Sequence, residues 1–269
     1  MKHIPERKKQ PFLYEHQRKA VEKMRNGCIL NGGVGSGKSR TALYYYFTQN
    51  GGKIETGKYI KMKKPKDLYI ITTARKRDDL EWEGEMLPFL LSTHPLEDDI
   101  YHNKVVVDSW NNIKKYDSVE NAFFIFDEQR VVGYGAWSKA FIKIAKHNNW
   151  ILLSATPGDC WSDYIPVFIA NGFFKNKTEF NSEHVQFSRY TKYPQVERYL
   201  NTGRLIRLRN RILVDMDFNR KTTAHHEDIY VPYDISTYKD VIRNRWDIYK
   251  NEPIQQAAGL CYVLRRVVN

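Results

Sequence analysis

The sequence predicts an α/β fold, in which a parallel β-sheet is flanked by helices. Three observations support this fold class: a glycine-rich loop stands between a strand-like and a helix-like segment, the strand-like runs are apolar throughout, and helix-like segments alternate with them. Continuously apolar strands are typical of a sheet covered on both faces, and alternation with helices favours right-handed crossovers and parallel pairing. The strand-like runs are 28–30, 68–72, 105–107, 122–126 and 150–153.

The helices are predicted from apolar spacing and from the residues that end them. In the first helix apolar residues recur near helical spacing, and Asn26-Gly27 is a plausible stop. The lysine-rich stretch 53–66 is bounded by glycines and a proline, so we expect an exposed loop or hairpin, either lying against phosphates or simply solvated. The helix-like segments are 14–24, 40–49, 78–91, 109–116 and 136–147.

The glycine-rich loop fits a known phosphate-binding pattern. Residues 32–39 read GGVGSGKS and match G-x-x-x-x-G-K-[ST] at every fixed position. The glycines let backbone N–H groups face phosphate oxygens, Lys38 neutralises those oxygens, and the Ser39 hydroxyl binds Mg²⁺. We therefore expect ATP and Mg²⁺ as cofactors. The residues expected to contact the nucleotide here are Gly33, Gly35, Ser36, Gly37, Lys38, Ser39 and Arg40.

Acidic and hydroxyl residues follow two of the later strands. Asp127 and Glu128 come directly after the apolar run 122–126, at the strand end where parallel sheets bind ligands. Phosphoryl transfer needs one carboxylate near Mg²⁺ and a second group that orients the attacking water. Asp127 suits the metal and Glu128 the water, whereas Ser154 and Thr156, after run 150–153, are placed to sense the state of the acidic pair.

Composition limits the class of protein and of partner. The formal net charge is +12, from 43 Lys and Arg against 31 Asp and Glu. This excess favours an acidic partner, with nucleic acid first and mere colloidal solubility as the alternative. The sequence contains no apolar run of the roughly 20 residues that span a bilayer and no signal-peptide core. We expect no membrane partner and a cytoplasmic location, in the host cell if the chain is phage-encoded.

Together these segments resemble the superfamily 2 helicases and translocases, and within them the Swi/Snf-like branch. Residues 32–39 resemble motif I, residues 127–130 motif II and residues 154–157 motif III, in the expected order. The resemblance covers nearly the whole chain and implies a RecA-like P-loop NTPase lobe. It also implies that Lys38, Asp127 and Glu128 are catalytic.

Further elements of that family have counterparts here. Gln17, in LYEHQ, resembles the residue that contacts adenine, and segments 72–76 and 107–110 resemble motifs Ia and Ib. In the family these two motifs touch the nucleic-acid backbone, which implies DNA contacts. Arg130 stands where the family usually has His or Asp. The residues implied in DNA contact are Lys76, Ser109 and Trp110, and those implied in coupling are Ser154, Thr156 and Arg130.

The resemblance also implies a domain organisation. We expect the RecA-like lobe at residues 1–175 and a basic, mainly helical extension at 176–269, which leads toward a second RecA-like lobe. Arginines are dense in 204–214, as on a phosphate-tracking surface or a solvated helix face. Because the chain stops where the second lobe would begin, we expect that lobe in a longer protein or in a partner subunit.

The predicted function is that of the ATP-binding lobe of a DNA-dependent ATPase. We expect an ATP hydrolase of the helicase or translocase type that moves on DNA, with double-stranded DNA favoured and turnover poor in this chain alone. The alternative is a nucleotide-gated DNA-binding subunit that has no turnover of its own and needs a partner lobe.

Overall fold

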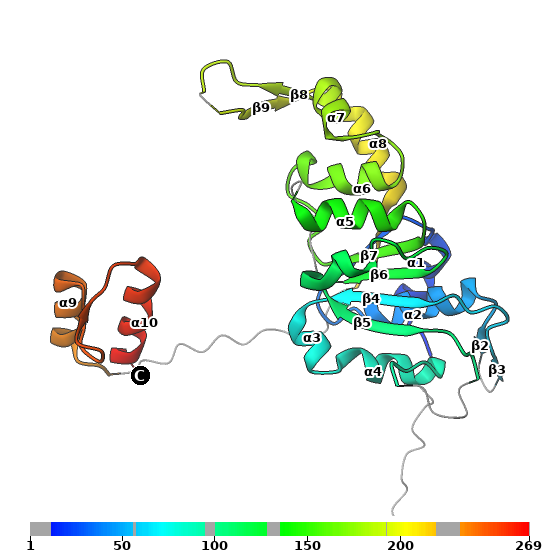
Figure 1. Ribbon diagram of the computed structural model, residues 1–269, viewed down its shortest axis with the longest axis horizontal. Helices are drawn as coiled ribbons and strands as arrows, with labels where there is room; N and C mark the ends of the chain where they lie inside the picture. The colour runs from blue at the N-terminus through cyan, green and yellow to red at the C-terminus, as the bar shows by residue number, and fades with distance from the viewer. Residues whose placement is uncertain are drawn as a thin grey trace, which may run out of the picture. The chain divides into compact units, whose positions relative to one another are not determined.

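The computed structural model describes residues 12–55, 58–94, 100–127, 135–191, 193–218 and 232–268 (Figure 1). The chain divides into two compact units, Met1–Asn219 and Arg220–Asn269. Within the described segments, no helix is long and apolar enough to cross a membrane.

A six-stranded sheet forms the centre of the first unit. Its strand order is β10-β1-β7-β6-β4-β5, and every neighbouring pair is parallel. The strands are β1 (Ile29–Asn31), β4 (Leu68–Thr72), β5 (Val105–Ser109), β6 (Phe123–Asp127), β7 (Asn149–Ser154) and β10 (Leu213–Asp215). The predicted fold class, a parallel sheet flanked by helices, is confirmed. Because all six strands run the same way, their carboxyl ends share one edge of the sheet.

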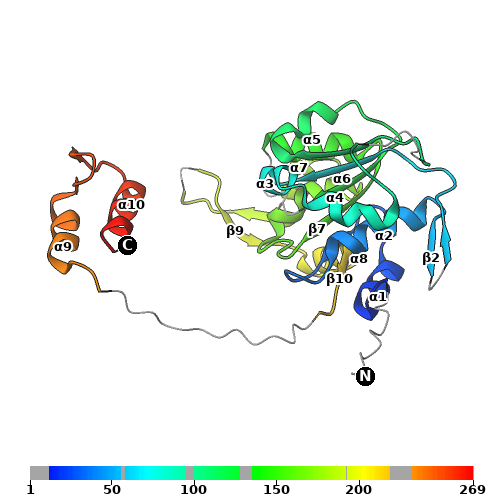
Figure 2. The same cartoon turned by 90° about the horizontal axis from the view of Figure 1, so that it is seen from below.

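Helices cover both faces of the sheet, which explains why its strands are continuously apolar. Along β6, Phe124 and Phe126 belong to the core beneath α5, α6 and α8, whereas Phe123 and Ile125 belong to the core beneath α1, α2 and α4. Figure 1 shows α5 and α6 on one side of the sheet and α4 on the other, and Figure 2 shows α2 between α1 and α4. Alternate side chains of one strand therefore enter separate cores.

The helical elements of this unit follow the strands in order. The α-helices are α1 (Glu15–Lys23), α2 (Lys38–Gln49), α3 (Ala74–Asp78), α4 (Glu81–Met86), α5 (Ala136–Ala145), α6 (Ile165–Ala170), α7 (Lys177–His184) and α8 (Thr202–Ile212). Three 3₁₀ helices are η1 (Leu87–Phe89), η2 (Trp110–Tyr116) and η3 (Trp161–Tyr164). Two antiparallel hairpins are added, β2 (Lys53–Glu55) with β3 (Lys58–Ile60) and β8 (Val185–Phe187) with β9 (Val196–Tyr199).

Two predicted helices differ from the observed elements. The segment 78–91 is interrupted because Leu80 and Leu90 have positive φ values of 54° and 57°, so it divides into the end of α3, then α4 and η1. In the segment 109–116, Ser109 still belongs to β5, and the rest is the 3₁₀ helix η2. The stretch 53–66 contains the β2–β3 hairpin, one of the two expected forms.

The first compact unit extends well beyond residue 175, where we expected the lobe to end. Leu213–Asp215 forms strand β10, which pairs with β1 at the edge of the sheet. Leu205, Leu208 and Ile212 of α8 are buried in the core with α5 and α6. These contacts hold residues 176–218 in the lobe, and so only the residues after Asn219 form a separate unit.

The second unit is a small helical pair. It contains α9 (Ile235–Asn244), the short strands β11 (Trp246–Asp247) and β12 (Glu252–Pro253), and α10 (Ala257–Val268). Val241, Ile254 and Val263 form its core. Asp234 caps α9, because its carboxylate accepts hydrogen bonds from the backbone N–H groups of Ser236 and Thr237.

Candidate nucleotide-binding site

The phosphate-binding loop connects the end of β1 to the start of α2. Gly35 and Gly37 have φ values of 80° and 81°, in the left-handed region that favours glycine. A Cβ on Gly37 would lie 2.1 Å from Nε2 of Gln17, so this position has no room for a side chain. Helix α2 begins at Lys38, directly after this turn, and its N-terminal end therefore faces the loop.

Lys38 bends back over the loop that precedes it. Its Nζ donates hydrogen bonds to the backbone oxygens of Gly32, at 2.6 Å, and Gly33, at 3.1 Å. The ammonium group is therefore held above the curled backbone, where a bound phosphate would need a positive charge. Next in sequence, Ser39 lines a pocket of about 280 Å³ together with Lys76, Glu81, Trp82 and Glu85.

Gln17 and its neighbour His16 connect α1 to the phosphate loop. The Gln17 side chain is buried, accepts a hydrogen bond from the Tyr14 backbone N–H at 2.9 Å and donates one to the Ser36 backbone oxygen at 3.2 Å. His16 Nε2 lies 3.1 Å from the same oxygen. The sequence predicted the position of Gln17 at the site but missed His16, because a single histidine beside the motif carries no distinctive spacing.

Asp127 ends strand β6 as a buried carboxylate with an exposed fraction of 1%. Its Oδ2 accepts hydrogen bonds from the Thr72 hydroxyl at 2.9 Å and the Lys76 ammonium at 3.1 Å. The indole N–H of Trp110 donates to the Asp127 backbone oxygen at 3.0 Å. The carboxylate is therefore fixed from β4 and from α3, and the backbone of Asp127 is fixed from η2. Glu128 and Arg130, expected as the water-activating and coupling residues, lie outside the described residues.

The structure does not place the three expected DNA-contacting side chains on an open surface. Lys76 is directed to Asp127, and its side chain keeps an exposed fraction of only 19%. Ser109 and Trp110 have exposed fractions of 2% and 3%. Ser109 is still part of β5, and η2 turns the indole of Trp110 inward against Phe126. Ser109 and Trp110 thus have little accessible surface, and Lys76 is paired with the acidic site, while contact of these three residues with DNA stays a prediction.

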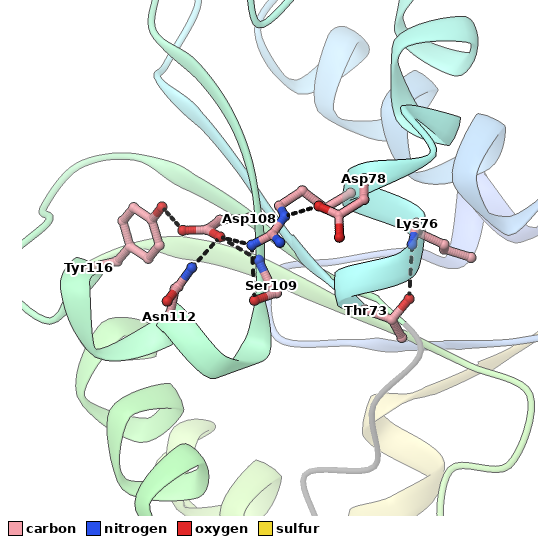
Figure 3. A network of polar contacts seen from close by, with 8 residues as sticks. Thr73, Lys76, Asp78, Asp108, Ser109, Asn112 and Tyr116 are labelled. Carbon is pink, nitrogen blue, oxygen red and sulfur yellow. Dashed lines mark hydrogen bonds and ion pairs between the residues drawn. The ribbon is translucent and has the colours of Figure 1, made fainter.

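Asp108 is the centre of a polar network that the sequence did not reveal (Figure 3). Its carboxylate accepts hydrogen bonds from Tyr116 at 2.7 Å, Asn112 at 2.8 Å, the Ser109 backbone N–H at 2.7 Å and Arg77 at 3.2 Å. Burial alone would raise the pKa of Asp108, but these hydrogen bonds outweigh it and hold the pKa below its ordinary value. The network joins α3, which carries Lys76, to the end of β5.

Ser154 ends strand β7, which lies between β1 and β6. Its side chain is buried, and its Oγ accepts a hydrogen bond from the Thr156 backbone N–H at 3.0 Å. Its backbone oxygen accepts one from the N–H of Gly32 at 3.1 Å. The segment expected to couple hydrolysis to movement is thus bonded directly to the first residue of the phosphate loop.

Arg40, expected at the nucleotide, has other partners. Its Nε donates to Glu85 at 3.0 Å, and its guanidinium lies 5.6 Å from the centre of the Phe12 ring. These contacts connect α2 to α4 and hold the Arg40 side chain on that side of α2.

Three of the four arginines of α8 lie over aromatic rings of the lobe. Arg204, Arg209 and Arg211 lie 5.1 to 5.5 Å from the ring centres of Phe174, Trp161 and Phe173 respectively. Arg204 also pairs with Glu183. Cation–π contacts of this kind stabilise the packing of α8 against neighbouring loops, so these three arginines have partners within the lobe.

Comparison with known proteins found similarity in fold but none in sequence. The chain matches no protein-family model and no curated protein in sequence. It is similar to the SWI2/SNF2 ATPase core of Sulfolobus solfataricus, solved in complex with dsDNA, with 15% identity and a TM-score of 0.53 over 74% of this chain. The chain covers 42% of that structure's length. The Hef helicase domain of Pyrococcus furiosus is also similar, at 18% identity and a TM-score of 0.38 over 64% of this chain and 39% of its own length. The fold of this chain is therefore similar to that of the SWI2/SNF2 ATPase core, as the resemblance of its motifs led us to expect.

Proposed function

We propose that this chain is the ATP-binding lobe of a DNA-dependent ATPase that moves on double-stranded DNA. The observation that carries the proposal is the alignment of three motifs on neighbouring strands of one sheet. The phosphate loop follows β1, the Ser154 segment follows β7, and Asp127 ends β6, in the order β1-β7-β6. Ligands of parallel sheets bind at this edge.

The donor groups present suit Mg²⁺ bound together with a nucleotide. Mg²⁺ usually binds one or two protein oxygens and takes its remaining ligands from water and phosphate. In the proposed site the Ser39 hydroxyl and the Asp127 carboxylate hold the metal, which neutralises charge on the phosphates when it is bound. Lys38 binds phosphate oxygens, Gln17 reads adenine and Glu128 orients the attacking water.

The proposed coupling runs through backbone contacts of the phosphate loop. The hydrogen bond from Gly32 to Ser154 joins the loop to the segment that carries Thr156. A shift of the loop on nucleotide binding would therefore move this segment, and we assign coupling to Ser154, Thr156 and Arg130.

Two observations support DNA as the partner. The net charge of +12 favours a polyanion, and the similar Sulfolobus ATPase core was solved in complex with dsDNA. Full turnover is proposed to need a second RecA-like lobe, in a longer chain or in a partner. An arginine supplied across such a cleft increases the rate of phosphoryl transfer by about 10³–10⁵.

The test measures ATP binding and hydrolysis by this chain, with and without double-stranded DNA and with a candidate second lobe added. Lys38→Ala should lower nucleotide affinity and abolish hydrolysis, whereas Glu128→Gln should retain binding and lose hydrolysis. Lys146→Ala, at an exposed position directly after α5, is the matched control and should behave as wild type. DNA-stimulated hydrolysis that disappears in Glu128→Gln would support the proposal.

A different result would favour the alternative function. Binding of ATP that changes DNA affinity, with no hydrolysis even after a second lobe is added, would indicate a nucleotide-gated DNA-binding subunit. Failure to bind nucleotide at all would refute both functions, because both depend on the phosphate loop.

A further inference from the structure

The β8–β9 hairpin exposes two tyrosines that none of the nucleotide-site motifs uses. Tyr190 has an exposed fraction of 97% and Tyr193 of 75%, the largest values among the exposed hydrophobic side chains that the structure describes. Figures 1 and 2 both show this hairpin projecting from the lobe, away from the central sheet. Exposed aromatic side chains that lie close together on a projecting element mark a candidate interaction site.

Hydrogen bonds hold the described residues of the hairpin from its base to the two tyrosines. At its base, Leu200 N–H donates to the backbone oxygen of His184 at 2.9 Å. Near the tip, Ser188 N–H donates to the backbone oxygen of Gln195 at 2.8 Å. Within the turn, Tyr190 N–H donates to the Ser188 hydroxyl at 3.3 Å, and the Thr191 hydroxyl donates to the backbone oxygen of Tyr193 at 2.8 Å. These local bonds use the polar groups of the turn and leave both phenol rings outside.

A groove beside the hairpin offers room for a ligand. Its volume is about 710 Å³, within the ~300–1,000 Å³ typical of ligand pockets. Its lining combines apolar side chains from both strands with hydrogen-bonding groups and one cation. These residues include Lys177, Asn181, Phe187, Thr191, Val196 and Tyr199.

The charge of the hairpin indicates a polyanionic ligand. Among its described residues, Arg189 lies next to Tyr190, Arg198 lies on β9, and Glu197 is the one carboxylate; all three are exposed, so that cations outnumber anions. Surfaces that bind single-stranded nucleic acid combine cations with exposed aromatic rings, as this hairpin does. The rings stack on bases and the cations contact phosphates. Stacking of this kind needs unpaired bases, because base faces are covered in a duplex.

We propose that the β8–β9 hairpin binds unpaired nucleotides of single-stranded DNA. Tyr190 and Tyr193 stack on bases, Arg189 contacts the phosphate backbone, and the groove accommodates the continuing strand. This binding is independent of ATP and of the proposed motor function. It gives the lobe a contact for a separated strand in addition to any contact with duplex DNA.

The test compares binding of a fluorescent 20-nucleotide oligothymidylate and of a duplex of the same length, without nucleotide, by fluorescence anisotropy. For the double variant Tyr190→Ala/Tyr193→Ala we expect at least a ten-fold loss of affinity for the single strand, because each stacked base contributes about five-fold to 150-fold. Duplex affinity should change less than two-fold. Tyr190→Phe/Tyr193→Phe should restore single-strand binding, because phenylalanine also stacks.

Controls separate this site from folding and from the nucleotide site. Tyr262→Ala removes another exposed tyrosine, on α10, and should leave both affinities unchanged. Arg189→Ala should weaken single-strand binding. It should also reduce the slope of log affinity against log salt concentration by the amount that corresponds to about one phosphate contact. Lys38→Ala should bind the oligonucleotide as wild type does, so failure of the motor proposal would not affect this result.

Three outcomes would overturn the proposal. They are no measurable binding of the oligothymidylate by wild type, unchanged single-strand affinity in the double alanine variant, and an equal loss of affinity for single strand and duplex. The last outcome would indicate a contact with the backbone of any DNA rather than stacking on bases.

Discussion

Lys76→Met tests whether Lys76 serves the acidic site rather than DNA. Lys76 donates to the 1%-exposed carboxylate of Asp127 at 3.1 Å, and methionine keeps most of the side-chain volume while removing the charge. Removing one partner of a buried pair costs about 3–5 kcal/mol. Because the Lys76 side chain remains 19% exposed, we expect a smaller loss of unfolding free energy, about 2–3 kcal/mol.

The assay is thermal unfolding with and without Mg²⁺ and a non-hydrolysable ATP analogue. For a domain of this size 1 kcal/mol lowers Tm by about 2–4 °C, so the variant should melt roughly 4–12 °C below wild type. The ligand should raise the Tm of the variant more than it raises the Tm of wild type, because in the variant Mg²⁺ supplies the positive charge that Lys76 no longer provides beside Asp127. Lys146→Met, an exposed substitution, should change Tm little.

A double-mutant cycle with Asp127→Asn provides the refutation. If the two side chains interact as observed, Lys76→Met should cost little once Asp127 is neutral. Purely additive losses would show that the pair does not contribute to stability. A Tm equal to that of Lys146→Met would equally refute the role assigned to Lys76.

Three further results are expected. Asp108→Asn should lower the free energy of unfolding by about 2 kcal/mol at pH 7, because several donors lose their charged acceptor. Since the pKa of Asp108 is lowered in the folded state, the difference from wild type in denaturant titrations should persist down to about pH 4 and shrink below it. A difference that grows as the pH falls would contradict the network. Gly37→Ala should destabilise the lobe by more than 1 kcal/mol, because Gly37 has a φ of 81° and the added carbon would meet the Gln17 side chain. Gly33→Ala should not destabilise it, because no atom lies within 4 Å of the added carbon. Equal shifts of Tm in the two variants would refute this difference. Burial raises the pKa of Cys28 to about 11. A thiol reagent at pH 8 should therefore react quickly with the two exposed cysteines and with Cys28 only after unfolding. Fast reaction of all three thiols would be inconsistent with the burial of Cys28.

The sequence predicted the features that depend on pattern along the chain. Every predicted strand is present, because apolar runs such as 122–126 are covered on both faces of the sheet. The position of Asp127 at a strand end followed from the same pattern. The glycine-rich turn of the phosphate loop could be predicted because positive φ values restrict such positions to very few residue types.

The sequence could not give the direction in which individual side chains point. Ser109 ends β5 and Trp110 follows it, and both side chains, which we expected at DNA, are buried. Lys76 was expected at DNA, and the sequence does not reveal its pairing with Asp127, which lies 51 residues away in the chain. The extent of the lobe was missed for a similar reason, since the pairing of β10 with β1 joins residues more than 180 positions apart.

The position of β10 has a mechanical consequence. The chain leaves the first unit through this strand, which is hydrogen-bonded in parallel to β1, the strand that carries the phosphate loop. Asn31 also donates a side-chain hydrogen bond to Asp215 at 2.7 Å, and Met216 N–H donates to the Asn31 backbone oxygen at 2.8 Å. Tension applied to the chain beyond residue 218 would load these bonds in shear, so that they would have to break together rather than one at a time. A pull on the exit from this lobe would thus be transmitted to the loop where the nucleotide is proposed to bind.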